Sequence, residues 1–369
     1  MTDPERVPPG EAAQIEDIIR LTVAQMKRRY ADGKPILRGV HPKDHGCVSA
    51  TFQVHDSLAP ELRVGVFAEP GRKYEAVIRY SNASVLVADD ALGSRGMAVK
   101  LRGVNGTRLL ENAEAGTQDF LMVNHPVFAI ANVEDYQALS QVLLEDNDNP
   151  ARFFARIRKN ADGTPDMTDP VTVRAVTTFT IAQRLQADKF PPAFEPPPAC
   201  PVDSRYFSGA PFAFGDDRVM KYSAVPIGRT PGEPDFKDPN YLRAALRACL
   251  TANGAKDVVF DFQVQLRDVA EVAPTIDTDI EDACTEWDES KHPFVSVATI
   301  TIPPQDFDTA QQKTMCETLR YSPWHGIAEH RPLGGINRLR RGVYEASANF
   351  REARAGGATP TGPEQRDSA

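Results

Sequence analysis

The chain has 369 residues, of which 41% are apolar and 25% are charged, so it is long enough to fold around a large buried core. This length is typical of two or three domains, although one large barrel with added helices also fits. The net charge of −9 disfavours nucleic-acid or anionic-membrane binding as the main function.

The cysteines and the N-terminus both bear on the compartment. The five cysteines are dispersed, with no CxxC pair and no metal-ligand spacing, which indicates reduced thiols. The N-terminus lacks a long apolar segment, and no run of about 18 apolar residues occurs in the chain. We therefore expect a cytoplasmic protein with neither an export signal nor a membrane span. The cysteines are Cys47, Cys200, Cys249, Cys284 and Cys316.

The first third of the chain combines one helix with a series of strands. Apolar residues at helical spacing predict an amphipathic helix over residues 11–31, and such a helix needs a partner to cover. Short segments with strand patterns and turn signals between them then follow, which favours an antiparallel barrel or sandwich. These strands are predicted at 48–54, 62–67, 74–82, 97–101 and 119–124.

The periodicity becomes helical after Pro126 and returns to that of strands later. Helices are predicted over 133–144, 151–158, 171–185 and 241–252, and strands over 219–225, 258–266 and 294–302. The proline-rich span 191–201 is predicted to be a loop packed on a surface, because proline continues neither a helix nor a central strand.

These elements predict an α+β chain with one closed antiparallel β-barrel of about eight strands, interrupted by a helical insertion. We expect a helical arm over residues 1–34 and the barrel core over 35–354. Residues 355–369 are small and polar, so we expect a disordered tail there.

The stretch 337–351 carries the most informative pattern. In a helix, Arg340, Tyr344, Ser347 and Arg351 share one face, yet a core stripe would carry Leu, Ile and Val. A tyrosine between two arginines indicates a face turned toward an anionic, aromatic-sized group such as haem, whose ferric iron accepts a phenolate ligand. A solvated basic helix with an incidental tyrosine is the alternative reading.

Five segments resemble, in order, the signature segments of haem catalases, and most closely those of the small catalase-related haem proteins. That group includes hydroperoxide-using peroxidases and allene oxide synthases. The resemblance extends over roughly residues 35 to 352, and five segments in the right order rarely arise by chance. The segments are 38–43 (RGVHPK), 78–81 (IRYS), 95–100 (RGMAVK), 124–130 (NHPVFAI) and 340–344 (RxxxY).

The resemblance implies a role for each matching residue. His41 looks like the distal histidine, Ser81 like the serine that contacts it, and Asn124 like the distal asparagine. Tyr344 looks like the proximal iron ligand and Arg340 like the cation that stabilises its phenolate. The remaining members of the implied haem-binding set are Arg38, Arg79 and Arg351 at the propionates, Val40 before the histidine, and Tyr136, which stands where catalases usually carry a phenylalanine.

The chemistry of these side chains agrees with the implied roles, but the same residues also allow other interpretations. A neutral imidazole can take a proton from one peroxide oxygen and deliver it to the other, and an amide can orient the peroxide. However, His45 is a rival to His41, and Asn124 could cap a strand. Arg38 and Arg79 could be surface charges. Trp324 and His330 are expected to order the loop before the proximal helix.

The resemblance implies haem b with ferric, tyrosinate-ligated iron and a peroxide-metabolising enzyme. Its substrates would be hydrogen peroxide or organic hydroperoxides, with an external electron donor. A hydroperoxide isomerase or dehydratase and a haem carrier or sensor are the alternatives. The chain ends soon after the proximal helix, so we expect no C-terminal helical domain, a monomer or homodimer, and a route open to bulky hydroperoxides.

Overall fold

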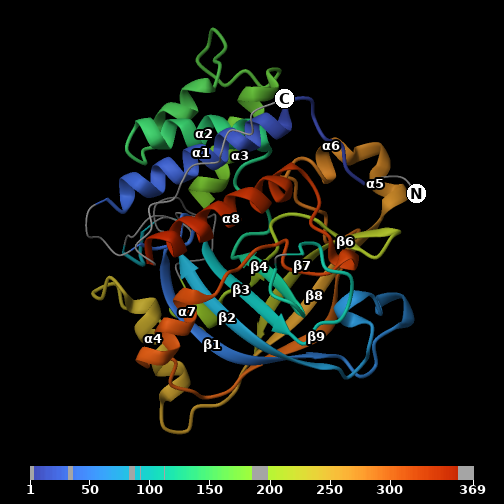
Figure 1. The fold of residues 1–369 in the computed structure, drawn as a ribbon. Helices are drawn as coiled ribbons and strands as arrows, with labels where there is room; N and C mark the ends of the chain where they lie inside the picture. Colours follow the sequence, from blue (N-terminus) through green and yellow to red (C-terminus); the bar gives the residue numbers. More distant parts are fainter. Residues whose placement is uncertain are drawn as a thin grey trace, which may run out of the picture.

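A closed antiparallel barrel forms the centre of the molecule (Figure 1). The structure, a computed structural model, describes residues 4–31, 36–82, 88–91, 93–111, 113–184 and 198–355. The strands follow the order β5-β4-β3-β2-β1-β9-β8-β7-β6, and the additional β5–β7 pairing closes eight of them while β6 extends β7 as a hairpin. This confirms the predicted barrel. The strands are β1 (Lys43–Val54), β2 (Lys73–Asn82), β3 (Arg95–Arg102), β4 (Thr117–Val123), β5 (Tyr206–Phe207), β6 (Phe212–Phe214), β7 (Arg218–Ile227), β8 (Val258–Asp268) and β9 (Phe294–Ile302).

Aromatic side chains fill the inside of the barrel. Phe52, Phe120 and Phe262 have no more than 1% of their surface exposed, and their ring centroids lie 4.9–6.1 Å apart. Because side chains alternate between the two faces of a strand, every second residue faces this core and the others face outward. The outward face of β2, β3 and β4 is therefore available to build a site.

The helices gather mainly on one side of the barrel (Figure 1). Helix α8 lies between the barrel and the layer of α1 and α2, and apolar contacts among Ile18, Val133, Ile336 and Leu339 join these helices. None of the helices in the described parts of the chain is long and apolar enough to cross a membrane. The helices are α1 (Glu11–Arg29), α2 (Val133–Glu145), α3 (Pro170–Arg184), α4 (Tyr241–Thr251), α5 (Val269–Val272), α6 (Ile276–Asp279), α7 (Ala310–Thr318) and α8 (Gly335–Ala355).

Two predicted elements differ in type. The strand predicted at 62–67 is wrong, because two 3-10 turns, Pro60–Leu62 and Gly65–Phe67, occupy this region and Gly65 has φ +56°. The helix predicted at 151–158 is a 3-10 helix, Ala151–Arg156. Residue 185, most of the proline-rich span (191–197) and residues 356–369 of the predicted tail lie outside the described residues.

A disulfide corrects the expectation of reduced cysteines. Cys47 of β1 and Cys316 of α7 are bonded, with their Cα atoms 5.7 Å apart. They are separated by 269 residues in sequence, so no spacing rule relates them, and only the packing of α7 against β1 brings them together. Cys200, Cys249 and Cys284 are free thiols. The cytoplasmic location stays a prediction.

Candidate functional site

A cavity of about 830 Å³ lies between the outward face of β2–β4 and the helices α1, α2 and α8. Strand alternation builds this wall: Arg79 and Ser81 line the cavity, while Ile78 and Tyr80, which alternate with them, belong to the barrel core. The volume is within the range of about 300–1,000 Å³ that is usual for small-molecule and cofactor sites.

Helix α8 supplies the opposite wall. Arg340, Tyr344, Ser347 and Arg351 all line the cavity, so the helical stripe read from the sequence faces a single space. Nη2 of Arg340 donates to the Tyr344 hydroxyl at 3.4 Å, and the guanidinium lies 5.4 Å from the centre of the tyrosine ring. Asn337 fixes Arg340 through a hydrogen bond of 3.0 Å. Asn337 thus helps to hold a positive charge beside the phenol oxygen.

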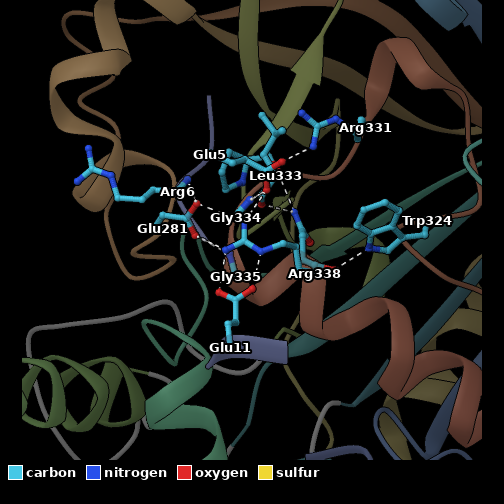
Figure 2. A network of polar contacts seen from close by, with 12 residues as sticks. Glu5, Arg6, Glu11, Glu281, Trp324, Arg331, Leu333, Gly334, Gly335 and Arg338 are labelled. Atoms are coloured by element: carbon cyan, nitrogen blue, oxygen red, sulfur yellow. Dashed lines mark hydrogen bonds and ion pairs between the residues drawn. The ribbon is translucent and has the colours of Figure 1, made fainter. Parts of the chain in front are cut away.

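The start of α8 is anchored by a cluster of ion pairs (Figure 2). Arg338 contacts the carboxylates of Glu5, Glu11 and Glu281 at 2.6–2.8 Å. The backbone N–H groups of Gly334 and Gly335 donate to Glu5 and Glu281 at 2.9 Å each. Carboxylates at a helix N-terminus also interact favourably with the helix dipole. The cluster therefore fixes the helix that carries Tyr344.

The residues of the preceding loop have structural contacts. The indole N–H of Trp324 donates to the carbonyl of Asn337 at 2.6 Å. His330 is fully buried, and its Nε2 accepts the N–H of Val66 at 3.1 Å. Neither residue lines the cavity, which agrees with the structural role expected for both.

His41 lies on the strand side of the cavity in a fixed orientation. Its Nδ1 is 3.0 Å from the Ser81 hydroxyl, and its carbonyl accepts a hydrogen bond of 2.9 Å from Arg79. The residue has φ 52°, a left-handed conformation that is uncommon outside glycine. Gly96 packs under the ring, and a Cβ at this position would lie 2.6 Å from it. With Nδ1 engaged by Ser81, Nε2 is the nitrogen available to a molecule in the cavity.

Burial and positive charge keep His41 neutral. Burial, followed by the positive charges of Arg79, Arg340 and Arg38, lowers the pKa of His41 to about 3. Since this value lies far below 7, the imidazole can accept a proton at neutral pH.

The structure separates the two rival histidines. His45 is buried, and its Nε2 hydrogen-bonds the side chain of Asn82 at 2.7 Å. Unlike His41, it does not line the cavity. The geometry thus favours His41 as the residue that meets a bound molecule.

Asn124 lies beside the cavity without belonging to its lining. Its side-chain oxygen accepts the Arg95 N–H at 2.7 Å, and its own N–H donates to the Arg95 carbonyl at 3.0 Å. These contacts are those of a residue that caps a strand end. Its neighbours Val123 and His125 do line the cavity. The structure therefore does not bring Asn124 together with His41 and Ser81 in the cavity wall.

Three buried arginines of the cavity lack a carboxylate partner. Arg79, Arg340 and Arg351 are 3–8% exposed, and none makes an ion pair with a carboxylate of the described residues. The Nε atoms of Arg79 and Arg340 are buried without a hydrogen-bond partner among those residues. Burial and the neighbouring Arg38 lower the pKa of Arg79 to about 9 and that of Arg351 to about 10. Such a site favours an anionic ligand.

Arg38 and Tyr136 also belong to the predicted haem-binding residues. Arg38 donates to the carbonyls of Cys316 and Leu319 at 3.0 and 2.9 Å and lies 3.4 Å from Glu317. Tyr136 lines the cavity and stacks on Phe128, with their centroids 6.4 Å apart. An aromatic wall, a phenol beside a cation and unpaired guanidinium groups fit a haem with its two carboxylates.

Solved structures with this architecture are catalases. A bacterial catalase matches with a TM-score of 0.61 and 16% identity, over 88% of this chain and 59% of that one. The chain has the catalase fold. A fungal catalase matches at 0.59 and 15% identity over 89% and 61%, and catalase A from Saccharomyces cerevisiae at 0.60 and 15% over 89% and 63%. This chain thus spans about 60% of the length of those catalases. No protein-family model and no curated protein sequence matches it.

Sequence reasoning missed several residues that line the cavity of this catalase fold. His125 is one: it follows the end of β4 and lines the cavity together with Leu121, Met122 and Val123 of that strand. Arg29 of α1 and Asp148 after α2 also line it and pair with each other at 2.7 Å. No local pattern could join these two, because they come from different helices.

Proposed function

We propose that this chain is a haem-dependent enzyme that metabolises peroxides. It would reduce organic hydroperoxides, hydrogen peroxide or both with electrons from an external donor. The observation that carries the proposal is the pairing of two walls across one cavity: Tyr344 beside Arg340 on α8, and the neutral His41 beside Ser81 on the barrel. We assign haem binding and the peroxide chemistry to the barrel core at 35–354, and residues 1–34 would form a helical arm.

The residues that would hold haem b follow from the donor set. The Tyr344 oxygen would ligate ferric iron, and Arg340 would keep that oxygen anionic. Arg38, Arg79 and Arg351 would pair with the propionates, since guanidinium groups bind carboxylates in a forked geometry. Val40 and Tyr136 would contact the macrocycle. When bound, the haem supplies the redox chemistry that breaks the O–O bond.

His41 would move the proton of the peroxide. The Nε2 atom accepts the proton from one peroxide oxygen and returns it to the leaving oxygen, which is worth about 10²–10⁴-fold in rate. For this task Nδ1 must carry a proton and donate it to the Ser81 hydroxyl, and this contact fixes the orientation of the ring. Asn124, the third residue that the resemblance implies on this side, does not line the cavity and contacts the Arg95 backbone instead, so we assign it no contact with the peroxide.

The lining of the cavity favours organic hydroperoxides over hydrogen peroxide. Leu121, Val127, Ile130, Leu139 and Val343 contribute apolar surface beside the polar groups. An isomerase or dehydratase acting on the same hydroperoxides would use the same residues. A haem carrier or sensor is less favoured, because storage needs neither a proton acceptor nor a serine to orient it. We expect a cytoplasmic monomer or homodimer.

The cofactor test compares two tyrosines that line the same cavity. The purified protein should show the spectrum of ferric, tyrosinate-ligated haem, and Tyr344→Phe should lose or badly weaken haem binding. The matched control, Tyr136→Phe, should retain it, because burial raises the pKa of Tyr136 to about 12 and disfavours a phenolate there. Full occupancy with an unchanged spectrum in Tyr344→Phe would remove this residue as the ligand.

Turnover then separates the candidate reactions. Steady-state rates with hydrogen peroxide, cumene hydroperoxide and a fatty-acid hydroperoxide should show peroxidase activity on the organic substrates with weak oxygen evolution. Fast oxygen evolution without reaction of cumene hydroperoxide would contradict this substrate choice. Consumption of a fatty-acid hydroperoxide without oxidation of an electron donor would instead identify the isomerase.

A further inference from the structure

A pair of cysteines, Cys200 and Cys249, lies outside the cavity, where α4 packs against the short 3-10 helix η4 (Pro201–Asp203). Cys200 precedes η4 and belongs to the core cluster, Cys249 lies in the last turn of α4 and packs against the same cluster, and the two thiols interact with each other. Cys200 is 5% exposed, whereas Cys249 is partly exposed. The partly exposed Cys249 is therefore backed by a second, buried cysteine.

A fixed cation lies against the more accessible sulfur. Nη1 of Arg229 is 3.3 Å from Sγ of Cys249, and Nε of the same guanidinium donates to Asp203 at 2.5 Å. Asp203 thus holds Arg229 in place and leaves its other nitrogen for the sulfur. A cation at this distance stabilises a thiolate, which is the nucleophilic form of cysteine.

The surrounding groups favour charge on Cys249 alone. The interaction with Cys200, together with the charge of Arg229, lowers the pKa of Cys249, although burial and Asp203 oppose this. The same interaction and burial raise the pKa of Cys200 well above its usual value. Tyr80 and Tyr206, which interact electrostatically with these thiols, have raised pKa values through burial and stay neutral.

We propose that Cys249 and Cys200 form a redox-active dithiol that reduces hydroperoxides and small disulfides at a site separate from the cavity. The proposal rests on the contact between the two thiols and Arg229, and it does not depend on haem binding. The accessible, charged sulfur attacks, and the buried thiol resolves the product.

The chemistry balances with the hydroperoxide as the oxidant. The Cys249 thiolate attacks the terminal oxygen, the O–O bond breaks, and the alkoxide takes a proton to leave as an alcohol. Cys249 is then a sulfenic acid, which condenses with the Cys200 thiol to form a disulfide and water. The two thiols lose two electrons and the hydroperoxide gains them. An external dithiol restores the pair by exchange.

The remaining free cysteine supplies an internal control. Cys284 is also partly exposed, but burial and the charges of Asp282 and Asp135 raise its pKa, so it stays a thiol. No guanidinium contacts its sulfur among the described residues. Exposure alone would make Cys284 and Cys249 react alike, whereas the proposed site makes Cys249 the selective target.

The first experiment counts thiols in the full chain treated with one equivalent of cumene hydroperoxide or, separately, oxidised glutathione. Wild type should fall from three free thiols to one, with a Cys200–Cys249 peptide in the digest. Cys284→Ser should form the same bond. In Cys200→Ser, dimedone should label Cys249 after peroxide, while Cys249→Ser should give no labelled Cys200. The glutathione arm gives its result whether or not the chain binds haem, so failure of the haem proposal is distinguishable.

A second experiment asks whether Arg229 activates the sulfur or only packs against it. In wild type, the alkylation rate of Cys249 should rise with pH around a midpoint below that of an ordinary cysteine, which is about 8.5. In Arg229→Ala the midpoint should move toward about 8.5, the value of an ordinary cysteine. A wild-type midpoint near that ordinary value, or no disulfide with either oxidant, would overturn the proposal.

Discussion

Arg338 and Arg340 lie two residues apart on α8 and have opposite surroundings. Arg338 is surrounded by three carboxylates, those of Glu5, Glu11 and Glu281 (Figure 2). Arg340 faces the cavity with no carboxylate partner among the described residues and a buried Nε atom that lacks a hydrogen bond. The positive charge of Arg338 is thus balanced by carboxylates, whereas that of Arg340 has no carboxylate beside it among the described residues.

This difference separates an arginine whose ion pairs stabilise the fold from arginines whose charge an anionic ligand would balance. Burying an ion costs several kcal/mol unless a partner repays it. At Arg338 the protein provides the partners itself. At Arg340, Arg79 and Arg351 the described residues provide no carboxylate, and in the proposed function the carboxylates of the haem would supply the missing negative charge. The predictions below test this contrast, beginning with the largest expected effect.

Removing His41 should separate binding from chemistry. His41→Ala should retain haem, because the proposed anchors lie elsewhere, yet slow the reaction with hydroperoxide by about 10²–10⁴-fold. Stopped-flow spectroscopy with cumene hydroperoxide would measure the rate. His45→Ala is the control and should react normally, since His45 hydrogen-bonds Asn82 away from the cavity. If only His45→Ala slows the reaction, the assignment of the distal histidine is wrong.

Removing the compensated arginine should damage the fold. Arg338→Ala leaves Glu5, Glu11 and Glu281 close together at the start of α8, and breaking such buried pairs costs about 3–5 kcal/mol in the free energy of unfolding. Urea unfolding would measure it. Arg341→Ala removes an exposed arginine of the same helix whose guanidinium lies 5.4 Å from the centre of the Trp324 ring, so it should change this free energy by no more than about 1 kcal/mol. Equal effects of the two substitutions would show that the ion pairs of Arg338 add no more to the free energy of unfolding than an exposed arginine does.

Removing an uncompensated arginine should instead damage ligand binding. Arg351→Ala should weaken haem binding by roughly ten- to a hundredfold, which corresponds to one charge-assisted hydrogen bond of about 1.5–3 kcal/mol. The haem-free protein should lose little stability, because the substitution removes a buried cation without stranding a carboxylate. Titration of haem followed by its absorbance would give the Kd, with Arg341→Ala as the control. An unchanged Kd would take Arg351 out of the propionate set.

Periodicity explains how much of this could be predicted from the sequence. Alternation located β1, β2, β7, β8 and β9 because each is long and packs one face into a core. The helical stripe on α8 placed Arg340 and Tyr344 on one face for the same reason. Elements of two or three residues, such as β5 and β6, carry too little pattern to detect, although β5 is the strand that closes the barrel.

Contacts between distant segments could not be predicted. The partners of Arg338 come from residue 5, residue 11 and residue 281, and the disulfide joins β1 to α7. The environment of Asn124 depends on the pairing of its backbone with Arg95. Charge compensation, which separates Arg338 from Arg340, is therefore visible only in three dimensions.

The pH dependence should show the smallest change of all. Burial, followed by Arg79, Arg340 and Arg38, lowers the pKa of His41 to about 3, below its unfolded value of 6.5. The unfolded chain therefore binds more protons between these values, so His41 reduces stability as pH falls through this window and leaves it unaffected above pH 6.5. A carboxylate ligand would offset the arginines but not the burial. The rate of reaction with hydroperoxide should then stay constant from about pH 5 to 8, because the imidazole is already neutral. An inflection near pH 6.5 that disappears in His41→Ala would show that the cavity leaves this histidine with an ordinary pKa.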